Sequence, residues 1–207
     1  MWACADTRIT DSIMGARVLL DEAPKIFALG VTTLGWDKIR FDFSPAAHTT
    51  VGLAYSGSML VGTNLFGILS PLFSNLQHVV SKRPLNFSDQ LPSMQSLAQM
   101  AVKVLEALVK TWALQDSVPP KIEAAIFGWC WVNHRIEVYH MRSQAGSANV
   151  SLTCLPLPDD GSVFLLGDHK DNIRGKIDVD EPGCQSSPWN TAGARCLQSA
   201  RLSDRTS

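Results

Sequence analysis

The chain has 207 residues, a length that fits one sizeable domain better than two very small ones. Hydrophobic residues make up 45% of it and charged residues 18%, a globular composition that excludes a coiled coil, a collagen-like repeat and an acidic disordered chain. The net charge is −1, from 18 basic and 19 acidic side chains. No field of one sign is therefore available to hold nucleic acid or an anionic membrane, and neither is expected as a partner.

The N-terminal residues and the cysteines favour a cytoplasmic protein. Residues 1–6 contain no basic segment leading into a long apolar one, so a secretory signal is not indicated. The five cysteines are far apart and form no Cys-x-x-Cys pair, so neither a disulfide framework nor a zinc site is expected. The uncharged stretch between Asp42 and Lys82 includes polar residues and Pro71, and we interpret it as a buried strand and a core helix rather than a membrane span.

Short β-prone segments fill the first quarter of the chain. Strands are predicted over 17–20 and 25–34, and Gly35-Trp36-Asp37-Lys38 is predicted as a turn. Residues 39–43 alternate apolar and polar side chains, as a hairpin partner does, and a further strand is predicted over 49–55.

Two helices follow these strands. Ser58 is the expected N-cap of the first, an apolar helix whose densest part runs from Met59 to Phe73. The second is predicted from about Ser93 to Gln115, because apolar residues recur there at spacings of three and four. These residues are Leu97, Ala101, Val104, Leu105, Leu108 and Trp112.

The chain then returns to strands. They are predicted at 122–132, 136–141, 149–155 and 162–167. The first of them is nearly all apolar, which fits a strand covered on both faces, and a turn at 133–135 joins it to its antiparallel partner. From 175 to 207 no periodic apolar face is visible, and we predict a polar, disordered tail. Two successive helices between groups of strands favour a layered α+β domain over alternating βαβ units.

Three motifs occur in a fixed order. The first is Ala5-Asp6-Thr7-Arg8-Ile9-Thr10 and the second is Lys25-Ile26-Phe27-Ala28-Leu29. The third is Ile126-Phe127-Gly128-Trp129, followed after a turn by Ile136-Glu137-Val138-Tyr139. Together they resemble the proteasome β-subunit family of N-terminal-nucleophile (Ntn) hydrolases, over about residues 3–170. The resemblance implies a four-layer αββα sandwich for a domain spanning 1–174.

The resemblance also implies a mechanism. The family's nucleophile is the hydroxyl of an N-terminal threonine, and the threonine's own α-amine, partly neutral near pH 7.7–8.0, is the general base. By motif position, Lys25 would keep that amine in its neutral form and Asp6 would hold the lysine. The backbone N–H of Gly57 would meet the developing oxyanion. The resemblance implies no cofactor and no metal.

Other polar groups receive no role. His134 and His140 flank a hairpin without a carboxylate at metal-ligand spacing, and Asp168-His169 has no partner motif. Gly167-Asp168 lies where the family has a Gly-Ser-Gly turn with a catalytic serine, but the serine is not matched here.

The sequence departs from the family at both ends. Only five residues precede Asp6, whereas the family's threonine lies about one hairpin strand and its turn earlier. We therefore expect an incomplete domain and no hydrolysis from the chain as written.

The first hypothesis is a threonine-type peptidase protomer of intracellular protein degradation, in a homo-oligomeric ring that takes polypeptide substrates, with an ATP-dependent unfoldase as a possible partner. The alternatives are a non-catalytic proteasome-like subunit in assembly or partner binding, and an unrelated α+β binding module.

Overall fold

The computed structural model describes eight ranges of the chain: 9–11, 17–20, 24–37, 42–77, 90–113, 120–143, 149–155 and 166–167. Asp6, the predicted tail and all but the last two residues of the predicted strand over 162–167 lie outside these ranges. By its internal contacts the chain divides between Gly167 and Asp168, and the second part lies wholly outside the described residues. The boundary placed after residue 174 stays a prediction.

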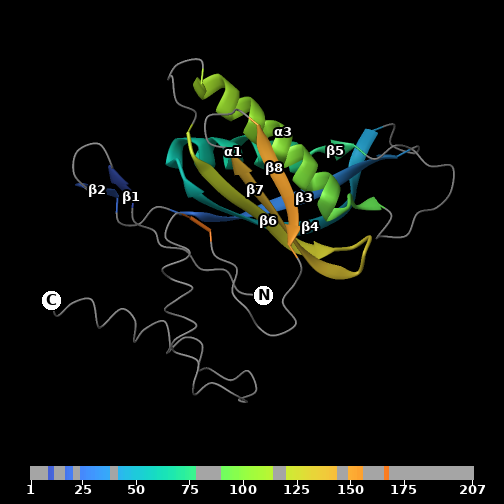
Figure 1. The fold of residues 1–207 in the computed structure, drawn as a ribbon. Helices are drawn as coiled ribbons and strands as arrows, with labels where there is room; N and C mark the ends of the chain where they lie inside the picture. The colour runs from blue at the N-terminus through green and yellow to red at the C-terminus, as the bar shows by residue number, and fades with distance from the viewer. Residues whose placement is uncertain are drawn as a thin grey trace, which may run out of the picture. The chain divides into compact units, whose positions relative to one another are not determined.

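Six strands form one sheet in the order β5-β3-β4-β6-β7-β8 (Figure 1). Their bounds are Ile26–Asp37 (β3), Asp42–Gly57 (β4), Leu76–Gln77 (β5), Ile122–Cys130 (β6), Arg135–Ser143 (β7) and Val150–Leu155 (β8). Neighbouring strands are antiparallel except β3 and β5, which are parallel. A separate antiparallel pair is formed by β1 (Ile9–Asp11) and β2 (Arg17–Leu20).

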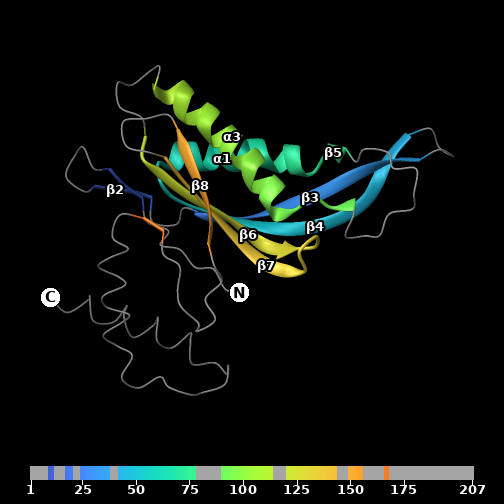
Figure 2. The ribbon, with the colours of Figure 1, turned by 45° about the vertical axis from the view of Figure 1, so that its right-hand side comes forward.

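Two helices lie side by side on one face of this sheet, α1 (Met59–Phe73) over β3 and β4 and α3 (Met94–Ala113) over β6, β7 and β8 (Figures 1 and 2). The Ser58 side chain accepts a hydrogen bond from the backbone N–H of Val61 at 3.5 Å, which confirms the predicted N-cap. The core fills the space between the two layers. Its largest fully buried side chains include Leu29, Leu53, Leu65, Phe73, Met94, Leu105, Ile126 and Met141.

The structure corrects the predicted hairpin near residue 40. Gly35, Trp36 and Asp37 belong to β3 rather than to a turn. Residues 42–43 of the predicted strand over 39–43 and the whole predicted strand over 49–55 are parts of the single strand β4, and residues 38–41 lie outside the described ranges. The register shifts opposite Leu34, so that Ala46 is an extra residue in β4. Pro45 adjoins this bulge, where the hydrogen bonds between the strands are already interrupted and the missing N–H of proline is tolerated. The segment around Pro45 therefore resembled a break between two strands.

The two predicted helices and the α+β class are confirmed. The described residues show two layers, a helix layer and a sheet, and the four-layer αββα sandwich is not shown by them. The sheet face opposite α1 and α3, called the distal face below, is the one that a second sheet would cover.

Candidate functional site

Polar residues on the distal face form one row across the sheet, called the polar row below. Ser56, Glu123, Arg142 and Ser151 are successive cross-strand partners on β4, β6, β7 and β8. Directly opposite residues in antiparallel strands lie on the same face of a sheet, so these four side chains are neighbours. The row crosses the sheet where β4 ends and β6 begins.

Glu123 is the centre of a buried ionic cluster in this row. The residue is only 3% exposed. One carboxylate oxygen, Oε1, lies 3.2 Å from Nε of Arg142, and the other, Oε2, lies 3.7 Å from Nε2 of His140. Oε2 also accepts a hydrogen bond of 3.2 Å from the backbone N–H of Gly167. A buried carboxylate is tolerated when charged and N–H groups surround it in this way.

Gly167 packs directly onto the polar row. Its φ of +110° is a left-handed conformation that favours glycine. A Cβ atom on Gly167 would stand 2.7 Å from the hydroxyl oxygen of Ser56, so a side chain does not fit there. The segment that ends at Gly167 is thereby held at the same sheet end as Gly57, the residue after Ser56.

Gly57 ends β4 with a φ of +99°, and a Cβ atom there would lie 2.4 Å from the carbonyl oxygen of Lys121. Only glycine fits this position without strain. Ser58 donates its N–H to the carbonyl of Lys121, and Tyr55 donates its N–H to the carbonyl of Lys25. N–H groups point alternately to the two sides of a strand, so the N–H of Gly57 is directed toward the β3 side of β4.

Lys25 immediately precedes β3 and lies directly opposite Tyr55, whose N–H reaches the Lys25 carbonyl at 3.0 Å. Lys25 and Gly57 are thus brought to the same end of the β3–β4 pair. Tyr55 is buried beneath the helices, with the pKa of its hydroxyl raised by that burial. Lys25 therefore shares the helix-side register with Tyr55, whereas Glu123 lies on the distal face. Whether Asp6 approaches Lys25 stays a prediction, since Asp6 lies outside the described residues.

The sequence-based interpretation passed over the Glu123 cluster. His140 receives no role in the sequence analysis because it lacks a carboxylate at metal-ligand spacing, yet the β6–β7 hairpin brings Glu123 to it across the sheet. One signal was available, namely a single acidic residue inside an otherwise apolar strand predicted to be covered on both faces.

A second buried carboxylate, Glu137, lies on the helix side of β7. It accepts hydrogen bonds from Asn133 at 2.8 Å, Arg135 at 2.9 Å and the Tyr139 hydroxyl at 3.2 Å. Burial by itself raises the pKa of Glu137, but these three donors and the charge of Arg135 outweigh it and hold that pKa below its ordinary value. Burial and the neighbouring Glu137 charge raise the pKa of Tyr139. With every group in it hydrogen-bonded, this cluster is a structural feature of the hairpin.

The rest of the distal face is apolar and shallow. A depression of about 500 Å³ is lined mainly by Ile26, Ala28, Gly52, Phe127, Trp129 and Ile136. The Phe127 ring lies over Gly52, where a Cβ atom would come within 2.3 Å of it. Within the described ranges, no group of three or more His, Cys, Asp or Glu residues is placed to hold a metal ion. No helix among them has the length and apolar character needed to cross a membrane.

The fold and the site define an α+β domain with a polar row at one sheet end, next to Lys25 and Gly57. No protein-family model matches the chain, and neither does any curated protein sequence. Among solved structures, the chain is similar to Anbu (ancestral beta-subunit) from Yersinia bercovieri, at 14% sequence identity and a TM-score of 0.43. The similarity covers 86% of this chain and 68% of the other. Similarity at this level establishes neither a common fold nor a function.

Proposed function

We propose that the chain is a protomer of a proteasome-like assembly of the Ntn-hydrolase kind, with its reaction centre, where it is active, at the sheet end of Lys25 and Gly57. The observation that carries the proposal is the meeting of these two residues at one end of the β3–β4 pair, although they are far apart in the sequence. The resemblance assigns both to one reaction centre, and that assignment required them to be close.

The local geometry suits the two roles. Gly57 lies two residues beyond the partner of Lys25, which corresponds to about 7 Å along a strand. Its N–H is directed to the β3 side, where Lys25 also lies, so one bound carbonyl group could receive that N–H near the lysine. The lysine charge would favour the neutral form of a threonine α-amine placed beside it. In this proposal Asp6 holds the lysine, the substrates are polypeptides, and an ATP-dependent unfoldase supplies them.

A non-catalytic subunit is the second candidate, and one observation favours it. Lys25 shares the register of the buried Tyr55, on the helix side, while the distal face at the same sheet end holds the Glu123–Arg142 ion pair. If an N-terminal threonine would have to lie on the distal face, Lys25 would not reach it. The chain would then serve in the assembly of a homo-oligomeric ring or in partner binding.

Peptidase activity and particle mass together test the two candidates. Because no hydrolysis is expected from the chain as written, it is expressed with an added N-terminal strand that begins with threonine and is assayed on fluorogenic peptides, and its mass in solution is measured by light scattering. Lys25→Ala is compared with Lys110→Ala, which removes an exposed lysine from α3. A catalytic protomer loses hydrolysis with the first substitution and keeps it with the second. A non-catalytic subunit shows no hydrolysis and a particle mass that is a multiple of the chain mass. A single-chain mass without hydrolysis contradicts both and selects an unrelated binding module.

A further inference from the structure

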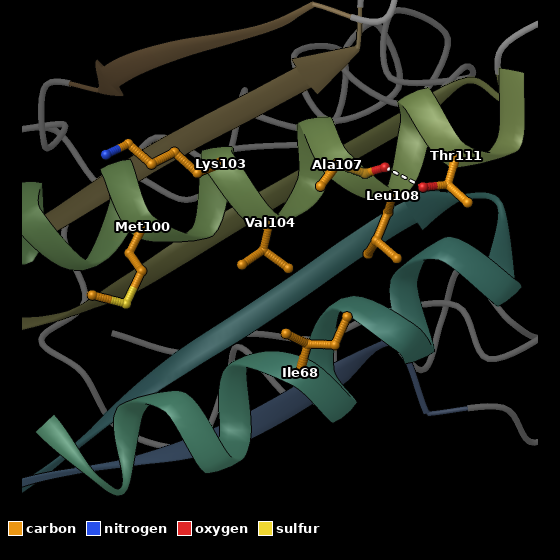
Figure 3. Close-up of a pocket in the computed structure, with 7 residues that line it drawn as sticks. All are labelled: Ile68, Met100, Lys103, Val104, Ala107, Leu108 and Thr111. Atoms are coloured by element: carbon orange, nitrogen blue, oxygen red, sulfur yellow. Dashed lines mark hydrogen bonds between the residues drawn. The ribbon is translucent and has the colours of Figure 1, made fainter. Parts of the chain in front are cut away.

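Contacts between distant parts of the chain differ between the two sides of the sheet. On the helix side they are mainly apolar: a groove of about 440 Å³ runs between α1 and α3, and Ile68 faces Val104 and Leu108 across it (Figure 3). On the distal face the Glu123 carboxylate accepts the backbone N–H of Gly167, which lies 44 residues further along the chain. This second contact depends on one charged group, so a single change of charge is enough to weaken it.

Glu123 has the partners of an ionised carboxylate. Arg142 lies 3.2 Å from one of its oxygens and His140 lies 3.7 Å from the other, and both come from β7. The neighbouring distal-face residues of β4 and β8 are uncharged: Ser56, Ala54, Ser151 and Thr153. None of these described neighbours is a second carboxylate, so the negative charge that meets the N–H of Gly167 in this cluster is that of Glu123.

The bond to Glu123 fixes Gly167 across two strands. Its N–H is bound on β6, while its backbone packs on β4, where a Cβ atom would stand 2.7 Å from the Ser56 hydroxyl oxygen. Ser56 immediately precedes Gly57, the residue whose N–H would meet the oxyanion in the proposed reaction centre. Gly167 therefore bounds that centre on its distal side.

We propose that Glu123 is a positioning residue: its negative charge holds Gly167 against Ser56, and neutralising that charge releases Gly167 while the sheet stays folded. A hydrogen bond to a charged acceptor is about twice as strong as a neutral one. The sheet itself does not need the charge, because β6 is joined to β4 and β7 by backbone hydrogen bonds and the half-exposed Arg142 can return to water. The inference rests on the proposed function for the role of Gly57, and Glu123 would act through Gly167 without touching the substrate.

The competing explanation is that Glu123 serves only the β6–β7 hairpin, through its ion pair with Arg142. The N–H of Gly167 would then be an incidental neighbour of the carboxylate. Neutralising Glu123 would in that case alter the stability of the sheet and leave Gly167 as it is. The two explanations therefore differ in what happens at the Gly167 amide.

The test measures hydrogen exchange of the Gly167 amide by NMR in the full chain at neutral pH. Glu123→Gln keeps an oxygen acceptor but removes the charge, so the protection factor of this amide should fall about five- to tenfold. Glu123→Ala also removes the acceptor and should leave the amide unprotected. The matched control is Glu106→Gln, because Glu106 accepts the backbone N–H of Val150 at 3.4 Å on the helix side. It should change exchange at Val150 and not at Gly167.

A pH titration adds a signal that a carboxylate serving only the hairpin would not give. In the wild type the Gly167 amide proton frequency should follow the ionisation of one carboxyl group between about pH 7 and pH 3, and Glu123→Gln should abolish this change. Rapid exchange of Gly167 in the wild type, or equal protection in Glu123→Gln, would overturn the inference. So would a loss of protection that extends to the amides of β6 and β7, because the release has to be local.

The consequence for the reaction is measured separately, in the chain that carries the added threonine strand. Glu123→Gln should lower kcat about five- to tenfold and Glu106→Gln should not, and an unchanged kcat in Glu123→Gln would refute the positioning role. The exchange and titration experiments need no hydrolysis, so the two failures can be told apart. A protected Gly167 in a chain that hydrolyses nothing contradicts the proposed function and still supports the hold by Glu123.

Discussion

Replacing Glu137 with alanine is expected to destabilise the fold by about 2–4 kcal/mol, and most of the cost comes from one of its three donors. Arg135 and Asn133 are exposed and can bind water once the carboxylate is gone. Tyr139 is only 6% exposed, so its hydroxyl loses its partner inside the protein. Cys154 is the cross-strand partner of Tyr139, and its thiol is only a weak acceptor. An unsatisfied buried hydroxyl costs about 1–3 kcal/mol.

This reasoning makes a double-mutant cycle decisive. Tyr139→Phe alone should cost about 1 kcal/mol, the usual net value of one hydrogen bond. In the background of Glu137→Ala the same substitution removes the stranded hydroxyl and should restore about 1–2 kcal/mol. The free energy of unfolding is measured by urea titration, with circular dichroism of the two helices as the signal. Additivity of the two substitutions within about 0.5 kcal/mol would refute the account.

Three further predictions follow from the two carboxylates and from Gly57. The pKa of Glu137 is lowered in the fold, so its charged carboxylate stabilises the fold above the unfolded pKa of about 4.3, and this stabilisation is lost as the pH falls through the folded pKa. In urea titrations taken from pH 7 to pH 3, the difference in free energy of unfolding between wild type and Glu137→Gln should therefore shrink. Gly57→Ala should lower the free energy of unfolding by about 1–3 kcal/mol in thermal melting, because Gly57 has a positive φ. The control Gly30→Ala, whose Cβ atom would meet only an exposed histidine at 3.4 Å, should stay within about 0.5 kcal/mol. Equal effects would contradict the strain expected at the positive φ of Gly57. Arg142→Gln should cost about 1–3 kcal/mol, because it takes the arginine charge away from the buried Glu123 carboxylate, and Glu123→Gln should cost less, because the half-exposed Arg142 then returns to water. The reverse order of urea midpoints would be inconsistent with a buried carboxylate.

The sequence was sufficient for features that depend on local periodicity. The helix predicted from Ser93 is found at Met94–Ala113, and the one capped by Ser58 is found at Met59–Phe73. Spacings of three and four fix such a helix without knowledge of the rest of the fold. The β3–β4 hairpin was mispredicted because its length depends on a bulge at Ala46, and a bulge is a property of strand pairing rather than of one strand.

Candidate site residues could be named only where a motif supplied them, and their roles stay a prediction. Lys25 and Gly57 were identified by their place in the family pattern, and the structure places them at one sheet end. Glu123 and His140 could not be paired from the sequence, because the register of β6 and β7 decides which residues face each other. An error of one residue in the position of the turn would move every side chain of β7 to the other face of the sheet. The observed turn includes His134 at a φ of +51°, a conformation that its sequence does not announce.

The absence of charged residues between Asp42 and Lys82 has one explanation in α1 and another in β4. Packing against the sheet explains the apolar residues on the inner side of α1, and a mixture of small and polar residues accounts for the distal side of β4. The side of α1 opposite its buried stripe carries Leu60, Asn64, Gly67 and Pro71, none of them charged. Charged residues are the usual occupants of an exposed helix face. On this face of α1 small and polar residues stand in their place, so the helix is uncharged on both sides without being apolar on both sides.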